Sequence, residues 1–202
     1  MSKIVITGTS RGIGFELVTQ LAAAGHQILA LSRNENPVLD LSLPGVTTWC
    51  FDITNTEHIK KAANWVKSQW GTADVLIHNA GILLNRPFKD STVDDFRAVY
   101  EVNVFGVAEL TRALVPFMEA EGHVLTISSM GGVQGSAKFP GLAAYSSSKG
   151  AVITLVELLA EEYKDTGPSF NVLALGAVQT EMLEAAFPGY QAPLSAREMA
   201  AY

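Results

Sequence analysis

Short apolar runs alternate with longer helical patterns along the whole chain. The strand-like runs cover residues 4–7, 26–32, 47–53, 74–81, 123–129 and 169–176. The helical patterns cover residues 14–25, 57–71, 93–119 and the stretch that follows Tyr145. Strands that are apolar throughout are buried on both faces, and strands that alternate with helices build right-handed βαβ units. The alternation therefore predicts an α/β fold, with one doubly wound parallel sheet between two layers of helices.

The length and composition are those of an ordinary globular protein. The chain has 202 residues, of which 48% are hydrophobic and 17% are charged, and it shows no repeat, linker or low-complexity segment. We therefore expect residues 1–202 to form a single domain. The net charge of −6, with no cluster of lysine or arginine, argues against binding to nucleic acid or to a membrane surface.

The start of the chain and its cysteine content bear on the compartment. Met1-Ser2-Lys3 leads directly into an apolar run that is too short for a secretory signal. The single cysteine, Cys50, excludes an internal disulfide and fits a reducing compartment. Because Cys50 lies in the apolar run TTWCFDI, we expect it to be buried. These features predict a cytoplasmic protein, and we expect no metal site.

A glycine-rich segment, TGTSRGIG (residues 7–14), joins the first strand to the first helix. Glycines permit a tight turn and let backbone amides approach a pyrophosphate, and the helix N-terminus adds unpaired N–H groups. The alternative is a tight loop without a ligand, but the strand-loop-helix position favours dinucleotide binding. The predicted binding residues are Gly8, Ser10, Arg11, Gly12, Ile13 and Gly14.

The end of the second strand indicates which dinucleotide is bound. A fold that binds NAD places an acid there, which accepts a hydrogen bond from the ribose 2′-hydroxyl. This chain has Ser32 and Arg33 instead, and Arg33 with Arg11 could hold a 2′-phosphate through charge-assisted hydrogen bonds. A plain surface arginine is the alternative. The sequence therefore favours NADP(H) over NAD(H).

A tyrosine and a lysine are four residues apart in Tyr145-Ser-Ser-Ser-Lys149, so they share one helical face. A nearby ammonium favours the phenolate, and about two to three pKa units is the ceiling for its effect. Such a shift would bring the phenol toward the range useful for general acid–base catalysis. The alternative is a polar start to a helix.

A serine pair ends the strand that precedes this helix, at the sheet edge where ligands bind. We assign Ser129 the role of holding a carbonyl oxygen beside the phenol, with Ser128 and Ser136 as the competing choices.

Two more polar residues have both a chemical and a structural interpretation. Asp52, at the end of the third strand, is either an acceptor for the adenine amino group or a helix cap, a role for which Thr54 and Asn55 compete. Asn103 lies in a long helical pattern, where asparagine is unfavourable. It either connects to Lys149 through water or is an exposed helical side chain.

Together these motifs resemble those of the short-chain dehydrogenase/reductase superfamily, in its single-domain branch, over essentially the whole chain. TGTSRGIG resembles the cofactor loop TGxxxGxG, HNAG (78–81) resembles NNAG, and GAVQT (176–180) resembles PGxVxT. The Asn-Ser-Tyr-Lys tetrad of the family is matched by Asn103, Ser129, Tyr145 and Lys149. The resemblance implies a Rossmann-type fold.

The resemblance also implies a mechanism, in which a hydride passes between nicotinamide and the carbonyl or secondary alcohol of a small molecule. Tyr145 is then the general acid or base, Ser129 orients the substrate, Lys149 binds the nicotinamide ribose and tunes Tyr145, and Asn103 supports a proton-relay water. The other cofactor contacts that it implies are Ile53, Asn79, Ala80, Gly81, Val178 and Thr180.

The chain departs from the family pattern in several places. His78 replaces the first asparagine of NNAG, Leu175 replaces a proline, and residues 135–141 lengthen the spacing from serine to tyrosine. We expect a structural role for His78. The sequence ends at LSAREMAAY, so we expect the last strand of the family sheet to be absent, and the substrate-covering segment after Thr180 is short.

The helix from 145 to 164 is apolar around more than one face, which predicts a homodimer through residues 98–119 and 145–164, with burial inside one subunit as the alternative. Two other functions share part of the pattern: a sensor that binds NADP(H) without turnover, and a sugar-nucleotide epimerase, for which the chain is short. The expected substrate walls, which include Leu83, Leu84 and residues 181–193, are apolar and unspecific.

Overall fold

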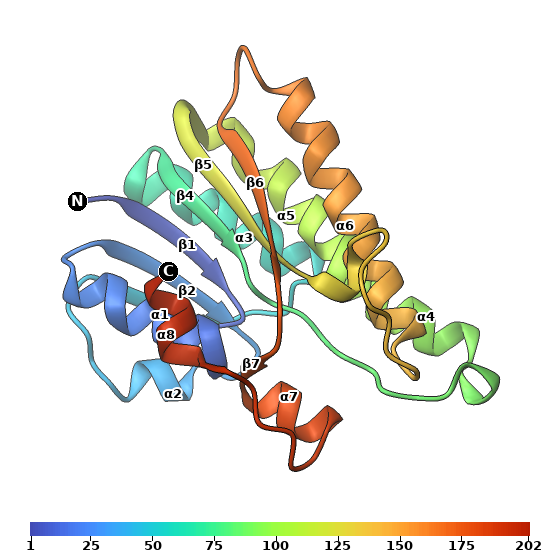
Figure 1. The fold of residues 1–202 in the computed structure, drawn as a ribbon. Coiled ribbons are helices and arrows are strands. Elements are labelled where there is room, and N and C mark those ends of the chain that lie inside the picture. Colours follow the sequence, from blue (N-terminus) through green and yellow to red (C-terminus); the bar gives the residue numbers. More distant parts are fainter.

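The computed structural model describes all 202 residues and contains one six-stranded parallel sheet (Figure 1). The strand order is β3-β2-β1-β4-β5-β6, so the order reverses between β1 and β4. The strands are β1 (Lys3–Thr7), β2 (Gln27–Ser32), β3 (Val46–Cys50), β4 (Ala73–His78), β5 (Met118–Ser129) and β6 (Ser169–Leu175). The predicted doubly wound α/β fold is therefore confirmed, with β3 and β6 as the sheet edges.

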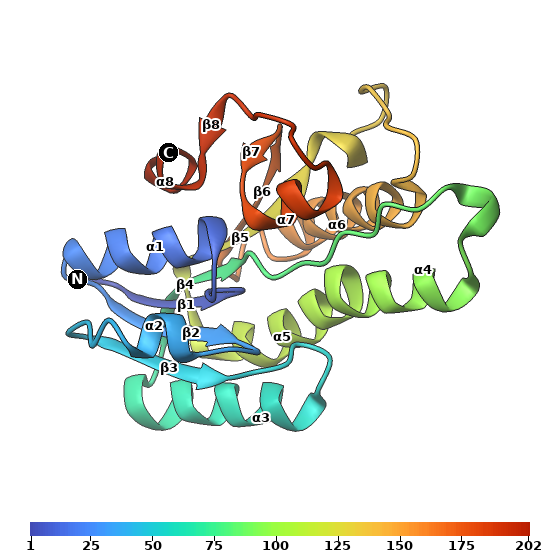
Figure 2. The same cartoon turned by 90° about the horizontal axis from the view of Figure 1, so that it is seen from below.

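Helices cover both faces of the sheet, as Figure 2 shows. On one face lie α1 (Gly12–Ala23), the short α2 (Asn36–Leu39) and α8 (Ala196–Ala201), which packs on α1. On the other lie α3 (Thr56–Trp65), α4 (Val93–Tyr100), α5 (Gly106–Leu114) and α6 (Ala143–Glu162). A segment of residues 82–92, which we call the strap, leads from β4 to α4 and passes beside α7 (Glu181–Ala186).

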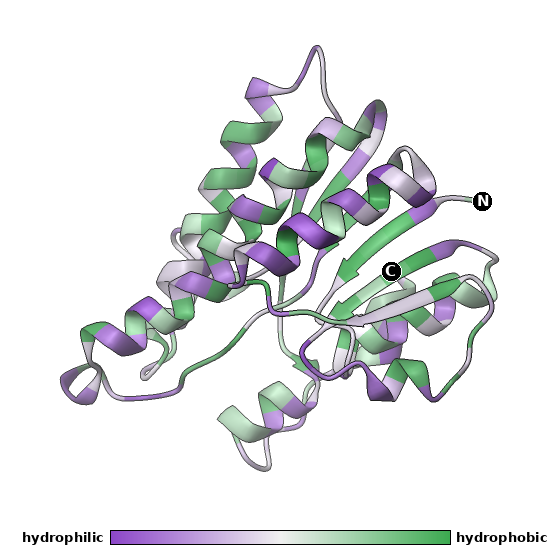
Figure 3. Cartoon of the chain, turned by 180° about the vertical axis from the view of Figure 1, so that it is seen from behind, coloured by the Kyte–Doolittle hydropathy of each residue, from purple (hydrophilic) through white to green (hydrophobic).

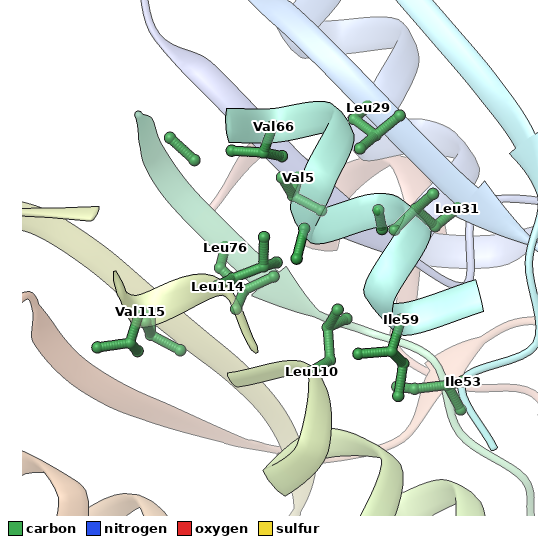
Figure 4. Packing of buried hydrophobic residues seen from close by; sticks show 14 of the residues in the cluster. Val5, Leu29, Leu31, Ile53, Ile59, Val66, Leu76, Leu110, Leu114 and Val115 are labelled. Atoms are coloured by element: carbon green, nitrogen blue, oxygen red, sulfur yellow. The ribbon is translucent and has the colours of Figure 1, made fainter. Parts of the chain in front are cut away.

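The core is divided by the sheet, because successive strand side chains point to opposite faces. In β1, Val5 belongs to the larger cluster under α3, α5 and α6, whereas Ile4 and Ile6 belong to the smaller cluster under α1 and α2. Figure 4 shows Leu76 of β4 next to Leu114 of α5 in the larger cluster. Figure 3, coloured by hydropathy, shows the same arrangement: the strands are largely hydrophobic, and the helices alternate between hydrophobic and hydrophilic residues.

The helical pattern predicted over residues 93–119 is confirmed as far as Leu114 and is wrong beyond it. Its α-helical ladder is interrupted by a π-helical turn at Glu101–Phe105, and α5 then ends at Leu114. A 3-10 turn, Val115–Phe117, follows, and residues from Met118 onward belong to β5. Pro116 explains the ending, because proline has no N–H to continue the helical hydrogen bonds. The α6 helix is close to its expected range.

Two features of the structure were not predicted. Cys50 is exposed rather than buried, because it is the last residue of the edge strand β3. After β6, a separate two-stranded parallel sheet forms from β7 (Val178–Gln179) and β8 (Leu194–Ser195), with α7 between them. None of the helices combines the length and the apolar character needed to cross a bilayer.

Candidate active site

A cleft of about 1300 Å³ opens at the carboxyl ends of the strands, where their order reverses. This is the position at which open α/β sheets bind ligands. Every site residue predicted from the sequence lines this cleft, with the exception of Gly14 and Asn103.

The loop between β1 and α1 has the shape of a phosphate cradle. Gly8 has φ +74° and Gly12 has φ +57°, in the left-handed region that favours glycine. A Cβ at Gly8 would lie 2.7 Å from the Cα of Ala80, and one at Gly14 would lie 2.2 Å from the carbonyl oxygen of Gly8. Gly14 therefore serves close packing below the cleft, while the start of α1 carries no side-chain cap and leaves its amides for a ligand.

The end of β4 is bonded to this loop. The Asn79 side-chain amide donates to the carbonyl oxygens of Thr7 (3.2 Å) and Gly8 (2.9 Å). The Thr7 hydroxyl accepts from the backbone N–H groups of Asn79 (3.2 Å) and Ala80 (3.1 Å). The side chain of Asn79 thus fixes the loop, and Thr7 is a structural partner that the sequence reasoning did not single out.

The far end of the cleft contains the groups expected to meet the adenosine. Ser32 donates its hydroxyl to the carbonyl oxygen of Asn34 at 2.7 Å, so Arg33 is the charged side chain that the end of β2 contributes to the cleft. Burial alone would raise the pKa of Asp52, but hydrogen bonds from Thr54 and the nearby Arg33 outweigh it and lower that pKa. The amide oxygen of Asn55, rather than Asp52, caps α3.

Tyr145 lies at the start of α6 and shares the cleft with Ser129, at the end of β5. Burial raises the pKa of the Tyr145 phenol, and a hydrogen bond with Ser129 partly opposes that rise. Ser128 is buried and donates its hydroxyl to the carbonyl oxygen of Lys149 at 2.8 Å. Ser136 donates to the carbonyl oxygen of Val133 at 2.8 Å.

The expected lowering of the Tyr145 pKa by Lys149 is not what this geometry gives. The ammonium of Lys149 donates to the carbonyl oxygen of Ile127 at 2.8 Å and lies 5.9 Å from the centre of the Tyr145 ring. Burial lowers the pKa of Lys149 itself to about 8. The predicted shift was wrong because it counted only the charge and neglected the burial of both side chains.

Asn103 is buried in the π-helical turn, which excludes the exposed helical side chain. Its oxygen accepts from the N–H of Ile82 at 2.9 Å, and its amide donates to the carbonyl of Ile82 and the hydroxyl of Ser148, both at 3.0 Å. A Cβ at Gly81 would lie 3.3 Å from the Asn103 oxygen and 3.5 Å from the Lys149 ammonium. Asn103 therefore positions the strap beside Lys149.

His78 lies behind the cleft and does not line it. It is buried, and its Nε2 is 2.8 Å from the hydroxyl of Thr111. That hydroxyl donates to the carbonyl oxygen of Val107, so Nε2 of His78 carries the proton. Burial, with a smaller effect of the Lys149 charge, lowers the pKa of His78 to about 3. The histidine is therefore neutral and structural.

The chain resembles known proteins over most of its length. Residues 2–191 match the short chain dehydrogenase family. An oxidoreductase, BOA17, of Botryotinia fuckeliana is 32% identical over 90% of this chain and 68% of its own length. Carbonyl reductase [NADPH] 2 of Sus scrofa is 31% identical over 79% of this chain and 65% of its own length.

A solved structure of a short-chain dehydrogenase also resembles this chain. A short-chain dehydrogenase of Streptomyces avermitilis superimposes with a TM-score of 0.82 and 34% identity, over 90% of this chain and 68% of that one. This chain spans between 58% and 68% of the length of the curated relatives that it matches. By the match of 2–191 and by these identities, the chain belongs to the short-chain dehydrogenase family.

Proposed function

We propose that the protein is an NADP(H)-dependent oxidoreductase that interconverts a carbonyl and a secondary or primary alcohol. The main support for this proposal is that one cleft contains both the glycine-rich loop and the hydroxyl groups of Ser129 and Tyr145. The loop that contains Gly8 and Gly12 lines one end of the cleft, and Ser129 and Tyr145 lie together at the other. When bound, the nicotinamide would supply or take up the hydride.

The residues of this chain would handle the substrate oxygen and its proton. In reduction, the Tyr145 phenol donates its proton to the carbonyl oxygen while the carbonyl carbon is reduced, and Ser129 donates a hydrogen bond that orients that oxygen. The raised pKa of Tyr145 keeps the phenol protonated at neutral pH, which is the form that a reductase requires. Lys149 and Asn103 hold the backbone around these hydroxyl groups in place, through their hydrogen bonds to Ile127 and Ile82.

Three features support NADP(H) over NAD(H). The end of β2 contributes the cation Arg33 to the cleft where NAD-binding folds place an acid. Arg11 lines the same cleft at the start of α1. A relative that is 31% identical is named a carbonyl reductase that uses NADPH.

The catalytic assignment is tested by Tyr145→Phe, which removes the proton and leaves the ring. We expect carbonyl reduction driven by NADPH to fall at least about 100-fold, because general acid catalysis contributes on this scale. NADPH binding, measured by fluorescence titration, should stay close to that of the wild type. The matched control is Tyr163→Phe at the far end of α6. Undiminished reduction by the Tyr145 variant would contradict the assignment.

The outer face of the α4–α6 region supports a homodimer. Phe105 and Leu158 are exposed by 51% and 63%, although both are apolar, and α4 packs beside α6. We propose that this face meets its copy in a second subunit, through α4, α5 and α6. We also propose a cytoplasmic location, since the single cysteine is free and exposed.

A further inference from the structure

The cleft divides into two parts with different chemistry. The charged side chains Arg11, Arg33 and Asp52 lie at the end formed by β1, β2 and β3. Beyond Ser129 and Tyr145 lies a second part, which we call the outer chamber. It is formed by residues of the start of the strap, of the 130–142 loop and of the segment from α7 to Tyr190. Its large side chains include those of Ile82, Met130, Phe139, Leu183, Phe187 and Tyr190.

Most polar side chains around the outer chamber are already bonded within the protein. The hydroxyl of Ser136 donates to the carbonyl oxygen of Val133 and accepts from the ammonium of Lys138 at 2.8 Å. That ammonium also donates to the carbonyl of Val133 at 2.6 Å. The amide of Asn85 donates to the carbonyl oxygen of Ala186 at 2.8 Å. These bonds within the protein leave the three groups only part of their capacity to bind a polar substrate.

The charges near the chamber also limit what it can bind. Lys149 is the only cation that lines this part of the cleft, and its buried ammonium is bonded to Ile127. Besides Asp52, the carboxylates that line the cleft are those of Glu101 and Glu181, and both residues are exposed. An anionic substrate would therefore meet carboxylates on the lining of the cleft, whereas the exposed Lys138 of the 130–142 loop does not line it.

Three of the apolar side chains of the outer chamber are exposed and would be covered by a bound ligand. Met130, Phe139 and Tyr190 are exposed by 45%, 58% and 51%. Large apolar side chains gathered at a concave site are typical of pockets that bury the hydrophobic body of a ligand. Aromatic rings stack well on other rings.

We propose that the substrate is a neutral ketone or aldehyde whose body beyond the carbonyl is apolar and the size of an aryl group. Ser129 and Tyr145 take the carbonyl oxygen, and the outer chamber takes the apolar body. Carboxylated, phosphorylated and polyhydroxylated carbonyl compounds are poor substrates. This inference rests on the proposed function, and it adds the class of substrate to it.

A matched set of three ketones tests the proposal: methyl 4-acetylbenzoate, 4-acetylbenzoate and butanone. The first two differ only in the negative charge, and the third lacks the aryl body. With NADPH in excess, we expect kcat/KM for the ester to exceed that for the acid and for butanone at least tenfold. Equal values for ester and acid, or for ester and butanone, would overturn the inference while leaving the proposed function intact.

Variants of the outer chamber test whether its side chains account for the preference for the aryl ester. Phe139→Ala should lower kcat/KM for the ester about tenfold and leave butanone within twofold. Phe88→Ala is the matched control, because Phe88 is 73% exposed and does not line the cleft. An equal loss for both ketones in Phe139→Ala would show a structural effect and contradict the proposal.

A binding measurement separates this inference from the proposed function, because it needs no turnover. Calorimetry with the alcohol product, methyl 4-(1-hydroxyethyl)benzoate, should show binding that Phe139→Ala weakens, and the matching carboxylate should bind at least tenfold more weakly. If no ketone is reduced, the proposed function fails, and the calorimetry still decides whether the chamber selects neutral aryl compounds. Equal binding of the ester and the carboxylate would refute the chamber proposal.

Discussion

The proposed preference for NADP(H) depends on Arg33, since Ser32 beside it is bonded to Asn34. Arg33→Ala should weaken NADPH binding about 10- to 100-fold through loss of charge-assisted hydrogen bonds to a 2′-phosphate, and NADH binding far less. Fluorescence titrations with both cofactors measure the two dissociation constants. Arg97→Ala, an exposed arginine of α4 that pairs with Asp94, is the control. Equal losses for both cofactors would contradict a contact with the 2′-phosphate.

His78 should make the fold sensitive to acid. Its pKa is about 3 in the folded protein, below the ordinary value of 6.5, so the unfolded chain binds the proton first as the pH falls. The stability that depends on the neutral ring is complete above pH 6.5 and decreases below it. At pH 5 the loss is about 2 kcal/mol, which is 1.36 kcal/mol for each pH unit below the unfolded pKa.

The substitution His78→Asn tests this, because asparagine does not titrate in this range. Urea unfolding of both proteins at pH 7.5 and pH 5 gives the free energies of unfolding. The wild type should lose about 2 kcal/mol more than the variant between the two pH values. If both proteins lose stability equally, the buried histidine is not the acid-sensitive group.

At the scale of elements, α7 is joined to the strap by one side chain. The amide of Asn85 donates to the carbonyl of Ala186 at 2.8 Å, across 101 residues of sequence. A Cβ at Gly141 would lie 2.1 Å from the Asn85 oxygen, so the loop before α6 also closes on this side chain. Asn85 thus connects all three segments of the outer chamber.

We expect Asn85→Ala to loosen α7 over the substrate. Loss of one hydrogen bond, about 0.5–1.5 kcal/mol, should raise KM for the ketone roughly two- to tenfold with little change in kcat. Steady-state kinetics separates the two constants. Asn64→Ala, on the exposed side of α3, should behave like the wild type. A fall in kcat with unchanged KM would argue that Asn85 acts elsewhere.

The elements themselves could largely be predicted from the sequence, because their signals are local. Apolar runs gave each strand of the main sheet, and the glycine-rich segment gave the loop before α1. The end of α5 was predicted too late, because the apolar pattern continues beyond Pro116 although the helix ends before this proline. The contacts of Lys149 with Ile127 and of Asn85 with Ala186 could not be predicted, because each joins residues far apart in the sequence.

At the scale of the whole molecule, the homodimer can be tested through its exposed apolar face. Leu158→Glu places a charge at the proposed interface and should convert the dimer to a monomer, since an unpaired buried charge is costly. Light scattering after size-exclusion chromatography gives the mass. Leu39→Glu, an exposed leucine on α2, is the matched control. A wild-type mass near 21.6 kDa, that of one chain, would refute the dimer.

The exposed position of Cys50 offers a way to observe the cleft directly. Its thiol lies 3.3 Å from the backbone oxygen of Arg33, and it is the only cysteine of the chain. A maleimide dye would therefore attach at one known place, beside the end of the cleft proposed to bind the adenosine, with no need to remove other thiols. Such a labelled protein would report nucleotide arrival as a change in emission, which would make rapid-mixing measurements of association possible.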